Sequence, residues 1–138
     1  MKNTHMARFV SLTSLASLLL VAGCSETINI QLEPKVDAYV VSASKQKVSL
    51  VETDTAYIEL QSWLQENQTG WHNTSGRFPG GVYIKSGKRG IQVTGMEVVI
   101  YTINGFEPDA QYVRNVGKTE LPLVRGITPV NSTAVLER

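Results

Sequence analysis

The sequence has a single cysteine, Cys24, and two histidines, His5 and His72, among 138 residues. One thiol cannot form a disulfide within the chain, and two histidines are too few for a histidine-rich zinc site. An excess of charge is also missing, because 13 basic side chains stand against 12 acidic ones. A nucleic-acid-binding surface needs a basic face to meet the phosphates, so we expect no nucleic-acid partner. We also expect no metal and no cofactor.

Long apolar runs are missing except at the N-terminus, where residues 9–22 follow Lys2 and Arg8 and are interrupted by serine and threonine. Fourteen helical residues reach roughly 21 Å at about 1.5 Å per residue, which is short of the roughly 30 Å hydrocarbon core of a bilayer. The run therefore predicts an export signal over residues 1–23 rather than a permanent membrane span.

The apolar run ends in Val21-Ala22-Gly23-Cys24, where small residues directly precede the only cysteine. This motif resembles the lipobox of bacterial lipoproteins. The resemblance implies cleavage before Cys24, transfer of a diacylglycerol to its sulfur and attachment of the mature protein to a lipid bilayer. It covers the N-terminal sixth of the chain and implies neither a fold nor an activity. The alternative is an ordinary secretory signal followed by a buried cysteine.

Two or three lipid chains on Cys24 would satisfy the requirement of two signals for stable anchoring. By the same resemblance, Ser25 after the cysteine favours the outer membrane, facing the periplasm, if the host is Gram-negative. Removal of residues 1–23 takes away two basic residues and leaves 11 basic and 12 acidic side chains. The mature protein is thus nearly neutral, and its stability must come from its core.

The mature sequence is rich in β-branched residues, with 14 Val and 8 Ile against 7 Leu, which favours strands over helices. We expect a lipidated N-terminus and tether over residues 24–35 and a single globular domain over 36–138. The predicted fold class is α+β, a small, mostly antiparallel β-sheet with one amphipathic helix packed on it. Within the tether, Ile28, Ile30 and Leu32 alternate regularly enough to begin the first strand instead.

The helix is predicted at about residues 55–67, where five apolar side chains share an arc of roughly 120° at 100° per residue. Asp54 or Thr55 is the expected cap. Strands are expected at 36–43, 47–52, 82–85, 91–94 and 96–103, and Asn104-Gly105 indicates a tight hairpin turn. Pro108 is expected to break the returning strand. Residues 111–116 are predicted as a short helix or a strand, and 119–125 as an edge strand at best.

The loop over residues 70–81 combines four glycines and a proline with Trp71, His72, Arg77 and Phe78. The glycines and the proline exclude regular structure, whereas tryptophan, arginine and aromatic side chains are typical of binding hot spots. We therefore predict that these four residues contact a partner. The alternative is that Trp71 and Phe78 plug the open end of a small sheet.

These patterns favour a non-enzymatic binding module, anchored in the cell envelope, that contacts a protein or cell-wall partner. One form of this function is an inhibitor that protects against a toxin or lytic enzyme. A second hypothesis is a structural accessory of an envelope assembly that binds through an exposed strand edge. A third is a small envelope hydrolase, using carboxylate pairs such as Glu52 with Asp54 or Glu107 with Asp109, or His72.

Overall fold

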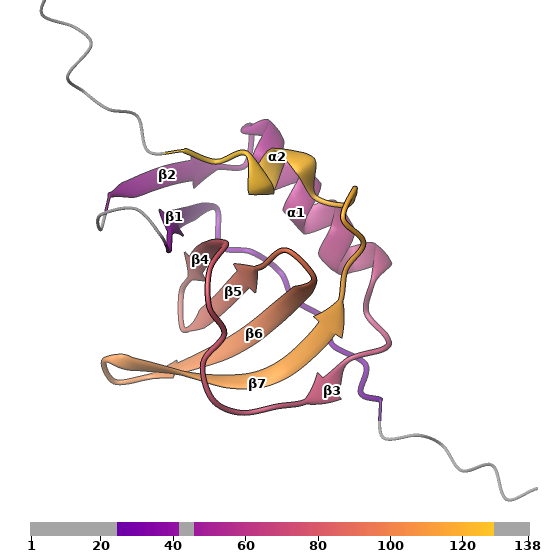
Figure 1. Ribbon diagram of the computed structural model, residues 1–138. Helices are drawn as coiled ribbons and strands as arrows, with labels where there is room; N and C mark the ends of the chain where they lie inside the picture. The colour runs from indigo at the N-terminus through magenta and orange to yellow at the C-terminus, as the bar shows by residue number, and fades with distance from the viewer. Residues whose placement is uncertain (1–24, 42–45, 129–138) are drawn as a thin grey trace, which may run out of the picture.

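The computed structural model describes residues 25–41 and 46–128 (Figure 1). The predicted signal peptide and Cys24 lie outside the described residues. The described chain forms one sheet and two helices with these bounds: β1 (Lys35–Val40), β2 (Lys47–Val51), α1 (Thr55–Glu66), β3 (His72–Asn73), β4 (Val82–Ser86), β5 (Arg89–Val93), β6 (Glu97–Asn104), β7 (Glu107–Asn115) and α2 (Pro122–Arg125).

The seven strands form an antiparallel sheet in the order β2-β1-β4-β5-β6-β7-β3. The α+β class and the antiparallel pairing are confirmed, but the sheet is larger than the small one expected. Its longest ladder joins β6 to β7, where a register shift occurs between Ile100 and Tyr101. As in any β-strand, successive side chains along β6 point to opposite faces of the sheet.

Pro108 does not break the returning strand, as the sequence had suggested, but lies inside β7 opposite Ile103. On its other side β7 pairs only with the two-residue strand β3, at Tyr112 and Val113. At Pro108, the edge of β7 that faces away from β6 therefore has no partner strand. Proline lacks a backbone N–H, but on this free edge its absence costs no hydrogen bond of the sheet. The same strand extends through residues 111–115, which settles the two alternatives in favour of a strand.

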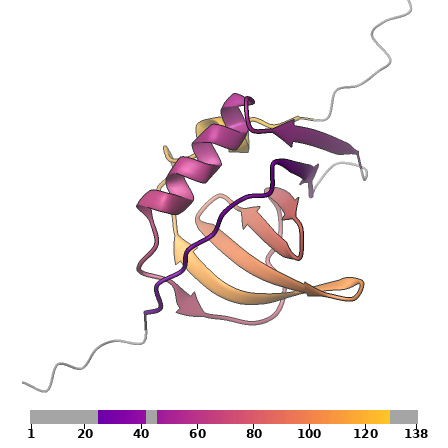
Figure 2. The same ribbon diagram turned by 180° about the vertical axis from the view of Figure 1, so that it is seen from behind.

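Helix α1 covers one face of the sheet (Figures 1 and 2). Four of the five side chains of the predicted apolar arc are buried, and Ala56 is partly buried: the buried ones are Tyr57, Leu60, Trp63 and Leu64. Asp54 stands at the N-cap position but makes no side-chain cap hydrogen bond. Its carboxylate instead accepts a hydrogen bond of 2.7 Å from the backbone N–H of Val51, the last residue of β2. The expected capping role is thus replaced by closure of the turn between strand and helix.

The segment expected as a tether lies in the core from Ile28 onward. Ile28, Ile30 and Leu32 are all buried, and Figure 2 shows their segment crossing the sheet alongside α1. The helix holds the segment by hydrogen bonds, because Gln61 Oε1 accepts from the N–H of Leu32 and Gln65 Nε2 donates to the carbonyl of Ile30, both at 2.8 Å. The tether prediction is therefore corrected for this part of the chain. The alternative, that the alternation begins the first strand, is also wrong, because residues 27–34 form no strand and β1 begins at Lys35.

Residues 119–125 contain the short helix α2 rather than an edge strand. Leu121 precedes it with a positive φ of 56° and is buried, as is Val124. The N–H of Val124 donates to Glu59 Oε2 on α1 at 2.9 Å. Burial of two apolar side chains and this contact with α1 favour a helical turn over a strand.

Candidate functional site

The face of the sheet opposite α1, called here the open face, carries a second apolar cluster. Its buried members are Val99, Tyr101 and Ala110, with Phe78, Tyr83 and Val113 packed against them. The loop between β3 and β4 crosses this face in front of β7 and β6 (Figure 1). The predicted binding loop therefore lies on the sheet instead of extending away from it.

A buried glutamine holds the loop in place. Gln92 on β5 is 3% exposed, and its Nε2 donates hydrogen bonds to the carbonyls of Phe78 at 2.8 Å and Gly80 at 2.7 Å. Its Oε1 accepts a hydrogen bond of 2.5 Å from the Tyr101 hydroxyl. Both amide donors and the amide oxygen are therefore engaged, as burial of a polar side chain requires.

A hollow of about 670 Å³, called here the open-face hollow, lies beside this loop. Its size falls within the range of about 300–1,000 Å³ that is typical of ligand pockets. Four aromatic rings contribute to its lining. The lining residues are Val41, Arg77, Phe78, Tyr83, Gln92, Tyr101, Phe106, Glu107 and Pro108.

The rim of the open-face hollow combines exposed apolar and charged side chains. Phe106, in the turn between β6 and β7, has a relative exposure of 104%, and Val41 is also exposed. Arg77 and Glu107 form an ion pair of 3.8 Å with side chains about 80% exposed. Such a solvated pair contributes little stability, so both charges remain available to a bound partner.

Tyr83 forms an apolar wall of the open-face hollow. Its ring packs edge-on against Tyr101, with the ring centroids 5.7 Å apart, and lies over Gly90, where a Cβ would collide with the hydroxyl and the ring. The hydroxyl is buried and has no hydrogen-bond partner among the described residues. Burial, followed by the neighbouring Tyr101 and Tyr39, raises the pKa of Tyr83 to about 12. This side chain is therefore held neutral.

Trp71 does not belong to this site, and its predicted role in partner binding is corrected. It is 1% exposed, packs edge-on against Trp63 at 6.1 Å, and donates a hydrogen bond of 2.7 Å from its indole N–H to the carbonyl of Asn67. Trp71 is thus a core residue, as the alternative interpretation expected for this side chain, but Phe78 does not share its place and packs against the second apolar cluster. Burial of this large ring in the main core explains why the following loop starts close to the sheet.

The other three predicted residues divide between two places. His72 is exposed on the edge strand β3, opposite Val113, and does not line the open-face hollow. Arg77 and Phe78 line it together. The structure therefore brings two of the four predicted residues to one site and leaves His72 outside it.

Sequence reasoning missed Tyr83, Gln92, Tyr101 and Phe106 as members of the site. A signal was present, because Tyr83 alternates with the aliphatic Val82 and Ile84 on β4, and Tyr101 alternates with Val98 and Ile100 on β6. Together with Gly90, which leaves space for a neighbouring ring, this pattern indicates an aromatic second face. Phe106 carried no such signal beyond its place in a tight turn.

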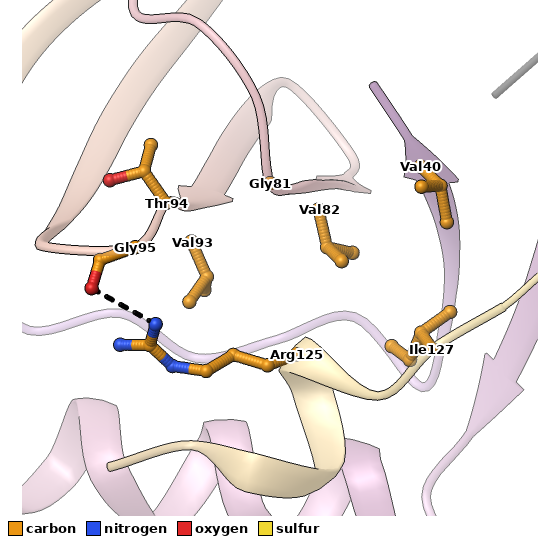
Figure 3. Close-up of a pocket in the computed structure, with 8 residues that line it drawn as sticks. All are labelled: Val40, Gly81, Val82, Val93, Thr94, Gly95, Arg125 and Ile127. Atoms are coloured by element: carbon orange, nitrogen blue, oxygen red, sulfur yellow. Dashed lines mark hydrogen bonds between the residues drawn. The ribbon is translucent and has the colours of Figure 1, made fainter. Parts of the chain in front are cut away.

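A smaller pocket of about 260 Å³ lies between the ends of β4 and β5 and helix α2 (Figure 3). Arg125 reaches across it and donates hydrogen bonds to the carbonyls of Gly95 and Gly117, both at 3.1 Å, and Glu120 at 2.8 Å. Its guanidinium is thereby used to fasten α2 to the turn between β5 and β6. We assign this pocket a structural role.

Strand β2 lies at one edge of the sheet, where a partner strand could be added, and the end of this edge is already occupied. Val51, at the end of edge strand β2, uses its N–H and its carbonyl in hydrogen bonds with the Oδ2 and N–H of Asp54. Two of the four carboxylates considered for hydrolysis have partners, since Glu107 pairs with Arg77 and Asp54 accepts from the N–H of Val51. Residues 25–41 and 46–128 contain no group of three His, Cys, Asp or Glu side chains arranged to hold a metal ion.

Comparison with known proteins finds no matching family model, no matching curated protein and no matching solved structure. In the part of the chain that the structure describes, no helix is long and apolar enough to cross a bilayer. The open-face hollow and the N-terminal motif are therefore the two features that indicate a function.

Proposed function

We propose that this protein is a non-enzymatic binding module, lipid-anchored in a bacterial cell envelope, whose partner contacts the open-face hollow. The observation that carries the proposal is the exposed Phe106 beside a hollow lined by three further aromatic rings. A phenylalanine in water forfeits the free energy of burial, about 1.5–3 kcal/mol, which a partner that covers it would recover. An exposed aromatic side chain beside an aromatic hollow is thus a surface that gains from contact.

The chemistry of the rim favours a protein partner. Protein interfaces combine an apolar, aromatic centre with a polar rim, and arginine and aromatic residues are enriched in them. Here the rings of Phe78, Tyr83 and Tyr101 supply the centre, and Arg77 and Glu107 supply charges of both signs at the rim. An inhibitor of an incoming toxin or lytic enzyme is one form of this function, because a small anchored domain needs only one such surface.

The anchor is supported by the lipobox-like sequence that ends at Cys24. We propose that Cys24 is the acylated first residue of the mature protein, held at the outer membrane and facing the periplasm if the host is Gram-negative. Mass spectrometry of the mature N-terminal peptide is the direct test. A thioether-linked diacylglycerol on Cys24 supports the anchor, and an unmodified thiol or a retained signal peptide contradicts it.

The binding surface is tested by comparing Phe106→Ala with Met96→Ala in the lipidated protein. Both side chains are exposed and apolar, but only Phe106 lines the open-face hollow. We expect the partner recovered from detergent-solubilised envelope to fall at least tenfold for Phe106→Ala and to stay unchanged for Met96→Ala. Equal recovery with both variants contradicts the assignment of the surface.

Purified, insoluble cell-wall polymer provides the second arm of this test. If the protein recognises a protein, neither the wild type nor Phe106→Ala should sediment with the polymer. Sedimentation of the wild type that is lost in Phe106→Ala would keep the binding surface and replace the protein partner with a glycan.

A further inference from the structure

The described chain is fastened to the folded body from its second residue onward. The N–H of Glu26 donates to the carbonyl of Trp71 at 3.1 Å, and the N–H of Ile28 donates to that of Gln68 at 2.7 Å. The carboxylate of Glu26 also accepts a hydrogen bond of 3.0 Å from the Tyr112 hydroxyl. Residue 26 is thus already part of the domain.

Only Ser25 separates Cys24 from Glu26. Because an extended chain advances at most about 3.6 Å per residue, the Cα atoms of Cys24 and Glu26 are at most roughly 7 Å apart. A tether over residues 24–35, as expected from the sequence, would have allowed roughly 40 Å. A lipid on Cys24 would therefore hold the body directly at the membrane surface.

The side chains around this attachment point suit a surface of lipid headgroups. We call residues 25–27 and 69–73 the anchor end, because the Glu26–Trp71 bridge joins these two segments. Its exposed side chains are polar, and its one large apolar side chain, Trp71, is buried. Such a surface can lie against hydrated headgroups without entering the hydrocarbon core.

The open-face hollow extends to the end of β6 and β7 that lies away from the anchor end. In Figures 1 and 2 the start of the described chain lies beside β3, at the end of β7 far from the turn that joins β6 to β7. From Val113, which pairs with His72, to Phe106 the chain covers seven residues, or roughly 24 Å at about 3.4 Å per residue. Phe106 is therefore distant from the attachment point.

We propose that the anchor end rests against lipid headgroups in a fixed orientation and that Phe106, at the far side of the open-face hollow, is held away from the bilayer. This inference rests on the proposed acylation of Cys24. It restricts the partner to one that presents its contact surface a few nanometres from the membrane, because the short connection does not let the body move further out.

The orientation is tested with a fluorophore on an added cysteine, either His72→Cys at the anchor end or Asn104→Cys at the β6–β7 turn, with Asn73→Cys as a second anchor-end position. All three residues are exposed. The lipidated proteins are placed in vesicles of phosphatidylcholine and phosphatidylglycerol that contain a headgroup nitroxide quencher. We expect quenching at 72 and 73 to exceed that at 104 at least threefold.

A matched variant carries a twelve-residue Gly/Ser insertion between Ser25 and Glu26. The insertion should lower the quenching at 72 to the level at 104, because a long flexible linker lets the body leave the membrane surface and rotate. Equal quenching at the three positions, stronger quenching at 104, or no effect of the insertion overturns the inference while leaving the anchor intact. An unmodified Cys24 in the mass spectrum overturns both proposals.

Discussion

The hydroxyl of Tyr101 on β6 donates a hydrogen bond of 2.5 Å to the side-chain oxygen of Gln92 on β5, and both residues are buried. The two donors of the same amide hold the carbonyls of Phe78 and Gly80. This pair therefore connects the sheet to the loop that forms one wall of the open-face hollow. The shape of the candidate site depends on it.

Replacing Gln92 with methionine keeps the volume of the side chain and removes its hydrogen bonds. Three polar groups then lose a partner in a partly dry environment, and we expect the free energy of unfolding to fall by about 2 kcal/mol. Urea unfolding followed by circular dichroism measures the change. Gln111→Met is the control, because Gln111 is exposed, and it should alter stability by less than about 0.5 kcal/mol. Equal effects of the two variants would show that the loop is held in another way.

Gly90→Ala should destabilise the fold through Tyr83. The added Cβ meets the hydroxyl and ring of Tyr83, so we expect a loss of roughly 1–3 kcal/mol from overpacking. In a Tyr83→Ala background the same substitution should cost much less, because the colliding ring is gone. A double-mutant cycle measures this coupling. Additive effects would contradict the close packing of the two residues.

Tyr83 should make stability fall at alkaline pH. Its pKa is raised from the usual 10.0 to about 12 by burial, so its contribution is fully present below pH 10. As the pH rises from 10 to 12, the unfolded chain loses this proton while the folded chain keeps it, and folding becomes less favourable. Melting temperatures across this range should fall less steeply for Tyr83→Phe than for the wild type. Identical slopes would contradict the buried, neutral hydroxyl.

Substitution of Trp71 should lower the stability of the fold, whereas substitution of Arg77 should leave it nearly unchanged. Trp71→Ala removes a buried ring and its hydrogen bond, and we expect a loss of about 3–5 kcal/mol. Arg77→Ala removes an exposed side chain with a weak ion pair, and stability should change by less than about 0.5 kcal/mol. Chemical denaturation compares the two variants. If Trp71→Ala barely changed the free energy of unfolding, Trp71 would not be a core residue and would again be a candidate for partner binding.

Local patterns in the sequence predicted much of the fold. The apolar arc predicted a helix at about 55–67, and α1 spans Thr55–Glu66. The strand expected at 96–103 and the turn at Asn104-Gly105 correspond to β6 and the β6–β7 hairpin. These elements depend on neighbours close in the chain, where periodicity and turn chemistry are decisive.

The parts that sequence reasoning missed depend on contacts between distant residues. Trp71 is buried because its segment meets Glu26 and the helix residue Trp63, and nothing in the loop composition indicates these partners. The open-face hollow likewise needs Phe78 to be brought to the sheet by Gln92, fourteen residues away. The composition of residues 70–81 thus indicated a site, but only the register of the sheet determines which side chains share it.

Site-specific photo-crosslinking tests the binding surface most directly. A photoreactive phenylalanine analogue replaces Phe106 in the lipidated protein in intact envelope, and the same analogue at Ile58, which is exposed on α1, serves as the control. We predict a discrete crosslinked protein from position 106 that is absent from position 58. Crosslinks of equal yield at both positions, or at position 58 alone, would contradict a partner at the open-face hollow.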